Sequence, residues 1–298
     1  MAKPRVGVIG VGAMGQGVAK ALLAKGFEVF VRDLVAAREA EAQAAGARTC
    51  ATPAQLARQS QVVVTLVVDA GQTRTVLFGP DGAAQAMQPG SVVVMSSTIA
   101  PGDAEAIAAQ LVAGGIPMLD APISGGPARA HAGTLSTMAA GTDDAFSRSE
   151  SVLAATSAKC FRVSARAGDG SRMKVVNNML AASNLAAGCE AMALAAKLGL
   201  DLRQVRDVVN ASSGQSWIFT DRMARALEGD YSPTAAARVL TKDIGLFVEL
   251  ARSLGIDPPM ARCAQAIFED TVERGYGEED DAAVLKRYAA AFGIVIPA

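Results

Sequence analysis

Residues 5–20, RVGVIGVGAMGQGVAK, constrain the fold more than any other stretch of this chain. A short apolar run leads into glycines with the G-x-G-x-x-G spacing, and a helix-like segment follows. In this order of strand, turn and helix, the spacing predicts a dinucleotide-binding fold, with a ligand-free tight turn as the alternative. Glycines permit the turn, the approach of a pyrophosphate and close helix packing. The expected cofactor contacts here are Gly10, Val11, Gly12, Ala13, Met14 and Gly15.

The second apolar run ends in VFVRDL, which places Asp33 21 positions after Gly12. A carboxylate at this point accepts hydrogen bonds from the adenosine ribose hydroxyls and repels a 2′-phosphate. The sequence therefore favours NAD over NADP as cofactor. Arg32 complicates this interpretation, because an arginine could turn toward a phosphate, and a simple turn role for Asp33 is the alternative.

The first half of the chain alternates short β-rich runs with helical stretches such as Met14–Lys25. Continuous apolar runs are typical of parallel strands that helices cover on both faces. This alternation predicts an α/β Rossmann domain with a doubly wound sheet. The expected strands are Arg5–Ile9, Glu28–Val31, Gln61–Val67, Ser91–Met95 and Pro117–Leu119, with weaker ones at Leu135–Met138 and Cys160–Val163.

After about residue 166 the β-rich runs stop, and no proline occurs from Asp169 to Lys197. That stretch can form one helix of roughly 40 Å at ~1.5 Å per residue, with Gly188 as a weak point. We expect an NAD-binding Rossmann domain over 1–165 and an all-α substrate and oligomerisation domain over 166–298, joined by this long helix. Further helices are expected at Leu202–Ala211, Ile218–Glu228, Thr234–Leu254, Pro259–Arg274 and Asp281–Ala291.

Composition excludes several classes of function. The chain has 28 basic and 29 acidic residues without a basic run, so a nucleic-acid partner is not expected. Scattered cysteines indicate reduced thiols and a cytoplasmic protein. Asn184 and Glu190 interrupt the longest apolar region, which favours a buried helix over a membrane partner. The single histidine, His131, expected in a loop, excludes multi-histidine sites, and no metal site is predicted.

Three further stretches carry candidate substrate contacts. SST (96–98) ends a strand at the carboxyl edge of the sheet, and DAPISGGPARAHAGTL (120–135) brings glycines after another strand. GDGSRMKVVNN (168–178) places Lys174 and Asn178 four residues apart on one helical face. Burial beside NAD⁺ would lower the pKa of a lysine toward roughly 7–8, so that it can act as a general acid/base.

Together these motifs resemble the β-hydroxyacid dehydrogenase family, which includes 3-hydroxyisobutyrate dehydrogenase and tartronate semialdehyde reductase. The resemblance covers essentially the whole chain. It implies that Lys174 is the catalytic lysine and that Lys242, in TKDIGL, reaches the cofactor; a solvated Lys242–Asp243 pair is the alternative. The substrate-binding residues that it implies are Ser124, Gly125, Gly126, Asn178 and Thr98, and Thr98 also touches the cofactor.

Two departures from the usual family pattern refine the resemblance. Val67 and Val68, which are expected cofactor contacts, replace a common Leu-Pro, and Arg129 replaces a common glycine. Both are similar to the branch that acts on sugar acids such as L-threonate. Alternatives are a 3-hydroxyisobutyrate or tartronate semialdehyde/glycerate dehydrogenase, an imine reductase, which usually lacks the lysine, and a non-catalytic dinucleotide-binding protein. The apolar helices predict a homodimer or homotetramer.

Overall fold

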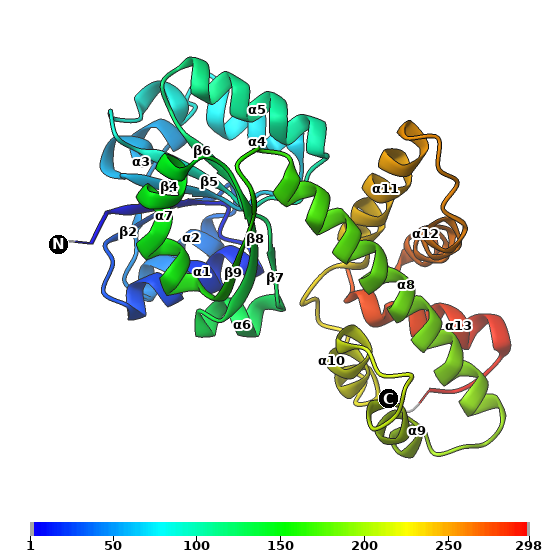
Figure 1. Ribbon diagram of the computed structural model, residues 1–298. Helices are drawn as coiled ribbons and strands as arrows, with labels where there is room; N and C mark the ends of the chain where they lie inside the picture. The colour runs from blue at the N-terminus through cyan, green and yellow to red at the C-terminus, as the bar shows by residue number, and fades with distance from the viewer. Residues whose placement is uncertain (1–2, 297–298) are drawn as a thin grey trace. The chain divides into compact units, whose positions relative to one another are not determined.

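The computed structural model describes residues 3–296 (Figure 1). The chain forms two compact units, one that ends at Lys174 and one that begins at Val175. The boundary between them lies inside helix α8, which spans Asp169–Lys197. The division at 165/166 that the sequence suggests stays a prediction.

The first unit contains one nine-stranded sheet in the order β3-β2-β1-β4-β5-β6-β8-β7, with β9 paired to β8. Strands β1 to β6 are parallel, whereas β8 runs antiparallel to β6 and β7 and parallel to β9. The strands are β1 (Val6–Ile9), β2 (Val29–Arg32), β3 (Arg48–Thr49), β4 (Val62–Thr65), β5 (Val92–Met95), β6 (Met118–Asp120), β7 (Ile123–Ser124), β8 (Leu135–Ala140) and β9 (Ser157–Ser164).

Helices cover both faces of this sheet, because successive residues of the buried strands point to opposite sides. In β4, Val62 and Val64 join the core under α1, α6 and α7, whereas Val63 joins the core under α3, α4 and α5. The expected doubly wound α/β domain is thereby confirmed. The helices of this unit are α1 (Ala13–Ala24), α2 (Ala36–Ala44), α3 (Pro53–Gln59), α4 (Ala70–Phe78), η1 (Ala84–Ala86), α5 (Pro101–Ala113), α6 (Gly126–Ala132) and α7 (Asp143–Thr156).

Three details of this unit differ from the sequence-based expectation. The two-residue strands β3 and β7 were not expected, because so short a strand leaves no periodic pattern. His131 lies in α6 and not in a loop, since Gly133, in the left-handed conformation, ends that helix two residues later. The strand expected over Gln61–Val67 ends at Thr65, and the remaining residues form the turn into α4.

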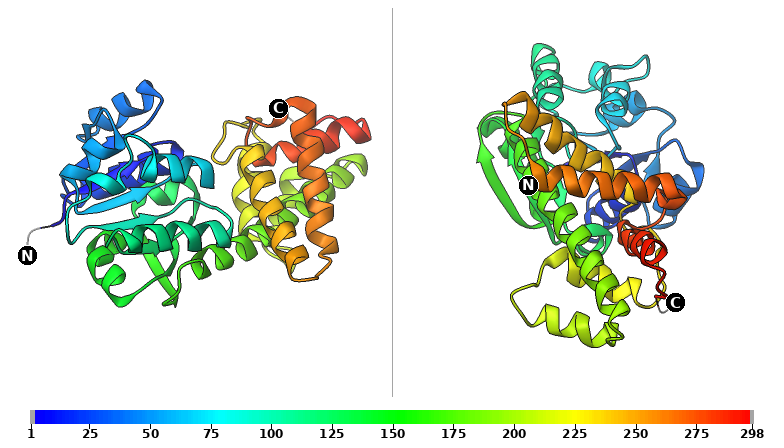
Figure 2. Two further views of the ribbon diagram at one scale, coloured as in Figure 1. Left: turned by 90° about the horizontal axis from the view of Figure 1, so that it is seen from above. Right: turned by 90° about the vertical axis from the view of Figure 1, so that its right-hand side faces the viewer.

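Over the described residues 175–296 the second unit is all-helical, as expected (Figure 2). Its core gathers residues from α8 and from each later α-helix. Gly188 does not weaken α8. A Cβ at this position would lie 2.5 Å from Phe219 Cδ2, so the glycine makes room for a buried aromatic ring of α10. The later helices are α9 (Leu202–Asn210), α10 (Trp217–Ala226), α11 (Ala237–Ser253), α12 (Pro259–Thr271), η2 (Val272–Tyr276), η3 (Asp281–Ala283) and α13 (Val284–Phe292).

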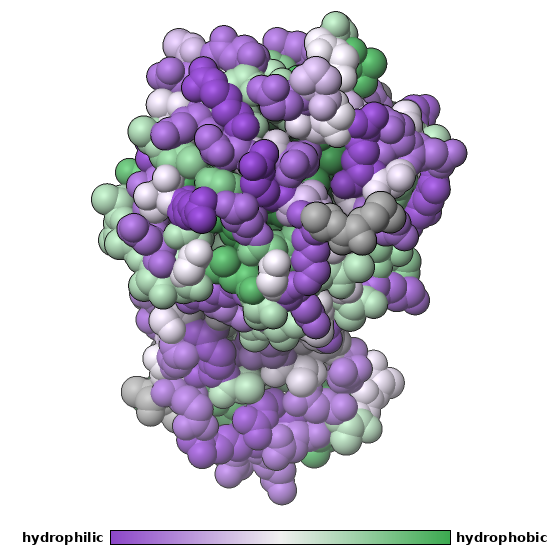
Figure 3. Space-filling model, turned by 90° about the vertical axis from the view of Figure 1, so that its left-hand side faces the viewer, coloured by the Kyte–Doolittle hydropathy of each residue, from purple (hydrophilic) through white to green (hydrophobic). Residues whose placement is uncertain are grey.

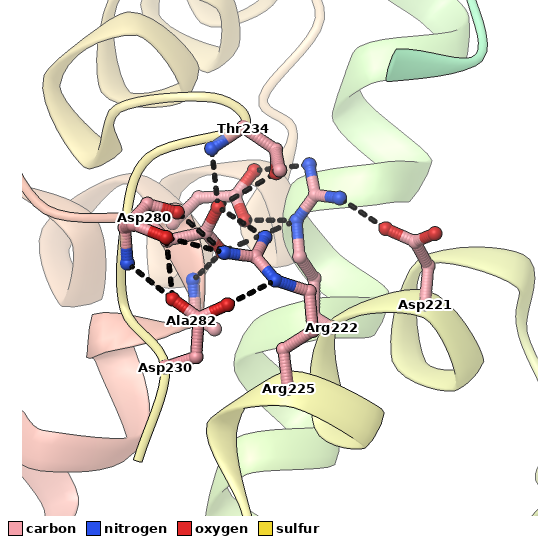
Figure 4. A network of polar contacts seen from close by, with 9 residues as sticks. Asp221, Arg222, Arg225, Asp230, Thr234, Asp280 and Ala282 are labelled. Atoms are coloured by element: carbon pink, nitrogen blue, oxygen red, sulfur yellow. Dashed lines mark hydrogen bonds and ion pairs between the residues drawn. The ribbon is translucent and has the colours of Figure 1, made fainter. Parts of the chain in front are cut away.

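A buried charge network ties α10 to the start of η3 (Figure 4). Arg222 donates to Asp281 through Nε (2.5 Å) and Nη2 (3.2 Å), and all three of Arg222, Asp280 and Asp281 are at most 4% exposed. Asp280 in turn accepts hydrogen bonds from the main chain and the hydroxyl of Thr234. Because each buried charge has an opposite partner, the network fixes the connection between α10 and α11 on the helical core.

Among residues 3–296, α8 alone is long and apolar enough to cross a membrane. It contributes Leu185, Cys189 and Met192 to the core of the second unit, as a core helix does.

On the face drawn in Figure 3, hydrophilic residues surround small apolar patches, which is ordinary for a surface exposed to water.

Candidate active site

The glycine turn between β1 and α1 has the geometry that its spacing predicts. Gly10 adopts a φ of +91°, and a Cβ there would lie 2.6 Å from the Leu66 carbonyl oxygen. A Cβ at Gly15 would lie 2.0 Å from the Gly10 carbonyl oxygen, so only glycine allows this approach. By contrast, no atom lies within 4 Å of a Cβ built at Gly12, the N-cap of α1. The open space at the start of a helix that no described side chain caps fits a pyrophosphate.

Asp33 follows β2, and its side chain is hydrogen-bonded to the glycine turn. Its Oδ2 accepts a hydrogen bond from Val11 N (2.8 Å), and its Oδ1 accepts one from Val35 N (2.9 Å). The Arg32 guanidinium donates to Glu39 Oε1 (2.9 Å), and Glu39 also accepts from Asp33 N (2.9 Å). Arg32 is therefore engaged by a carboxylate. The end of β2 presents two acidic side chains beside the glycine turn.

The turns after β4 and β5 meet at the same edge of the sheet. Val67 N donates to Ser97 Oγ (3.1 Å), and Val68 N donates to Gln72 Oε1 (3.1 Å). Thr98 follows Ser97 and is half-buried. Because Ser97 is buried and accepts a hydrogen bond from Val67 N, it holds the turn that carries the expected cofactor contacts Val67 and Val68. The pattern SST does not by itself indicate this role for Ser97.

The segment Ser124–Gly126 joins β7 to α6. Gly125 and Gly126 have φ values of +135° and +72°, which side chains rarely adopt. A Cβ at Gly125 would lie 2.8 Å from Arg129 Cδ, so the aliphatic part of Arg129 covers the position where a side chain would be. At Gly126, by contrast, no atom lies within 4 Å of a built Cβ, so the main chain there is free of side-chain cover.

Lys174 lies in the second turn of α8 and is only 8% exposed, although it is a lysine. The start of its helix is fixed to β6 by Asp120, which is fully buried. Asp120 Oδ2 accepts from Gly168 N (2.8 Å) and Ser171 N (2.9 Å), and Oδ1 accepts from Ser171 Oγ (2.8 Å). Burial raises the pKa of Asp120, while the hydrogen bonds from Ser171 and Gly168 act in the opposite direction.

In the second unit, Asn178 and Lys242 share one carboxylate. Asn178 Nδ2 donates to Asp243 Oδ2 (2.7 Å), and Lys242 Nζ forms an ion pair with Asp243 Oδ1 (2.8 Å). The Lys242–Asp243 pair forms, but Asp243 is only 4% exposed, so its carboxylate is not solvated as the alternative interpretation expects. Asn177 Nδ2 donates to Asn178 Oδ1 (3.0 Å), which fixes the amide from its other side.

The predicted site residues thus fall into contact groups within each unit. The structure links Asp33 to Val11 in the glycine turn, holds Val67 through Ser97, and links Asn178 to Lys242 through Asp243. Sequence reasoning missed Asp120 and the buried role of Asp243. Among the described residues, no cluster of three or more His, Cys, Asp or Glu side chains could hold a metal ion.

Comparisons with known proteins agree with both units. The NAD binding domain of 6-phosphogluconate dehydrogenase matches residues 5–164, and the NAD-binding domain of NADP-dependent 3-hydroxyisobutyrate dehydrogenase matches residues 168–288. The L-threonate dehydrogenase of Cupriavidus necator is 45% identical over 98% of this chain and 97% of its own length. That of Escherichia coli K12 is 41% identical over 98% and 96%.

A solved structure gives the same result. The crystal structure of 3-hydroxyisobutyrate dehydrogenase from Salmonella typhimurium superposes with a TM-score of 0.91 at 41% identity and covers 96% of this chain and 100% of that one. The sequence-based assignments of family and fold are confirmed, and the matched domains bind NAD or NADP. The chain therefore belongs to the β-hydroxyacid dehydrogenase family.

Proposed function

We propose that this chain is an NAD-dependent dehydrogenase of a small hydroxy acid, with L-threonate as the first candidate substrate. The observation that carries the proposal is the reversed burial at the start of α8. Lys174 and Asn178 are buried, whereas Met173, Val176 and Leu180 are 46–55% exposed. Burying a lysine costs free energy, and apolar side chains on the same part of the helix stay exposed, so the position of Lys174 points to a function and not to core packing.

Lys174 is the proposed proton carrier. NAD⁺ bound at the glycine turn would supply the hydride acceptor for the carbon that bears the reacting hydroxyl. The hydroxyl proton passes to the neutral amine of Lys174, and the carbon–oxygen bond becomes a carbonyl. In general, a buried lysine is a better base than an exposed one, because burial disfavours the ammonium form. In reduction, the ammonium returns the proton to the carbonyl oxygen.

The other predicted residues would bind and orient the substrate. Asn178 uses one amide hydrogen for Asp243 and one acceptor site for Asn177, which leaves it one donor and one acceptor. A hydroxyl group of the substrate, which both donates and accepts a hydrogen bond, matches the remaining donor and acceptor of Asn178. The glycine backbone at Ser124–Gly126 would hold the carboxylate, with Thr98 beside the cofactor and the substrate.

For the cofactor, the carboxylates after β2 favour NAD. Glu39 engages Arg32 and so opposes a turn of this arginine toward a 2′-phosphate. Asp33 adds a second negative charge at the same strand end. Gly10–Gly15 would bind the pyrophosphate, Val67 and Val68 would cover the cofactor, and Lys242, in TKDIGL (241–246), would reach it.

A panel of substrates tests the proposal. NADH absorbance is followed with L-threonate, 3-hydroxyisobutyrate, glycerate and L-serine, since relatives 30–31% identical to the chain are named for 3-hydroxyisobutyrate and L-serine. Turnover with L-threonate above the other three is expected. Lys174→Ala should lower kcat by about 10²–10⁴-fold while NAD affinity is kept. No turnover with any hydroxy acid, together with tight NAD binding, would instead indicate a non-catalytic dinucleotide-binding protein.

We also propose that the protein is a cytoplasmic homodimer or homotetramer. Its four cysteines are all free thiols. Exposed Leu180 and Leu194 lie on one apolar stripe of α8, which a second copy of the chain would cover. Light scattering on Leu180→Glu/Leu194→Glu should show a smaller mass than on the matched control Leu254→Glu, also strongly exposed but outside α8. Equal masses for the two variants would contradict this arrangement.

A further inference from the structure

Asp120 joins two segments that the proposed function treats separately. Its main chain ends β6 and continues within four residues to Ser124. Its side chain accepts three hydrogen bonds from Gly168 and Ser171, 48 and 51 residues away along the chain. Ser171 lies one helical turn before Lys174. One carboxylate therefore connects the segment expected to hold the substrate with the helix that carries the expected proton donor and acceptor.

The backbone supports the same connection. A Cβ at Gly170 would lie 2.4 Å from the Asp120 carbonyl oxygen and 2.6 Å from the Met138 carbonyl oxygen. The start of α8 thus rests directly on the main chain of β6 and β8. An α-helix is stiff over one turn, so a shift at Ser171 carries Lys174 with it.

A second aspartate at the same helix start makes different contacts. Asp169 accepts hydrogen bonds from Ser164 Oγ (2.7 Å), Arg166 (3.1 Å) and Arg172 (2.7 Å). None of these three partners belongs to β6 or to the segment after it. Asp169 therefore links the start of α8 only to residues near it in the chain. Of the two aspartates, only Asp120 links the start of α8 to β6, the strand that leads to Ser124.

We propose that Asp120 is a positioning residue for the reaction: its buried carboxylate sets the position of Lys174 relative to the segment Ser124–Gly126. The inference rests on the proposed function, since it assumes that Lys174 moves the proton and that this segment holds the substrate. Proton transfer requires a heavy-atom separation of about 2.6–3.2 Å, so a small displacement of the helix lowers turnover. Binding of the dinucleotide at the glycine turn does not depend on this connection.

Four variants of the full-length protein test the inference by steady-state kinetics and NAD titration. Asp120→Ala removes all three hydrogen bonds, and kcat should fall by about a hundredfold, as for a ~1 Å misplacement, without loss of NAD affinity. Asp120→Asn keeps an oxygen for both main-chain donors, and the Ser171 hydroxyl can turn to accept from the new amide. This variant should restore kcat to within about tenfold of wild type. Ser171→Ala, which removes one bond, should fall between wild type and Asp120→Ala.

Asp169→Ala is the matched control, because it removes an aspartate that also accepts from a serine hydroxyl at the same helix start. It should lower stability and leave kcat near the wild-type value. Equal kcat for Asp120→Ala and Asp169→Ala, measured on folded protein, would overturn the inference. If Asp120→Ala does not fold, Ser171→Ala decides, and an unchanged kcat in that variant is the contrary result. Lys174→Ala separates the proposed function from the role of Asp120. If Lys174→Ala keeps wild-type turnover, the proposed function is refuted. If Lys174→Ala is inactive and Asp120→Ala is fully active, only the role of Asp120 is refuted.

Discussion

Gly170→Ala tests the contact between α8 and the sheet with a single methyl group. Gly170 is the second residue of α8, where alanine is ordinarily the better helix former by up to about 1 kcal/mol. The added Cβ would lie 2.4 Å and 2.6 Å from two main-chain oxygens, of Asp120 and Met138. Both belong to buried strands of the central sheet, so neither can move aside as a flexible side chain would.

The size of the effect follows from these distances. Non-bonded heavy atoms rest roughly 3.5 Å apart, so the start of α8 must move by about 1 Å. Overpacking of this kind costs about 1–3 kcal/mol, and the gain in helix propensity offsets up to ~1 kcal/mol of it. We expect a net destabilisation of about 1–2 kcal/mol in urea unfolding. Because Lys174 moves with the helix, kcat should fall by up to about a hundredfold.

Gly102→Ala provides the matched control. Gly102 is the second residue of α5, and no atom lies within 4 Å of a Cβ built there. Propensity alone then acts, so this variant should be as stable as wild type or more stable, with unchanged kcat. If Gly170→Ala matched Gly102→Ala in both stability and kcat, α8 would not rest on the main chain of β6 and β8.

Three further predictions follow from charged residues. Asp33→Asn should raise kcat/KM for NADP relative to NAD by about tenfold or more, because one of the two carboxylates that oppose a 2′-phosphate is removed; an unchanged cofactor ratio in NADH and NADPH assays would contradict this. Arg222→Met should cost about 3–5 kcal/mol in urea unfolding, because two buried aspartates lose their cation; a loss below ~1 kcal/mol would show that the network is solvated. Hydrogen bonds from Ser164, Arg166 and Arg172 lower the pKa of Asp169 to about 2, so its stabilising effect is complete above pH ~4 and is lost as the pH falls through 2. Asp169→Asn should therefore flatten the dependence of unfolding on pH between about 4 and 2, and an unchanged slope would refute the assignment.

Elements with a strong repeating pattern were predictable from the sequence. Val62 and Val63 point to opposite cores, so a strand buried on both faces is a continuous apolar run in the sequence. The helix expected over Asp169–Lys197 is observed with the same bounds. Two-residue strands such as β7 leave no such pattern. The role of Gly188 was also unpredictable, because it depends on Phe219, a residue 31 positions away whose packing no local rule describes.

The same distinction applies to the candidate site. Gly10, Gly15 and Asp33 were readable because the glycine spacing and an acidic residue after the second strand recur at fixed positions in the β1–α1–β2 unit of dinucleotide-binding folds. Asp120 and Asp243 were not, because their hydrogen-bond donors lie 48, 51 and 65 residues away. An aspartate beside a strand or a lysine is also ordinarily exposed. Nothing in a short window of sequence distinguishes a buried acceptor from a solvated charge.

In α8, the buried polar residues and the exposed apolar residues both depart from the pattern of an ordinary core helix, and both need an explanation. A helix of a self-contained unit buries its leucines and exposes its lysines, because transfer from water favours the first and opposes the second. In α8, Lys174 is 8% exposed and Leu180 is 55% exposed. The core of the second unit does not require either feature, since Leu185 and Met192 already supply its apolar contacts. Under the proposed function, proton transfer would account for the buried lysine, and a contact with a second copy of the chain would account for the exposed leucine. We therefore expect that variants of Leu180 change the mass of the particle and that variants of Lys174 change its turnover, each without the other effect.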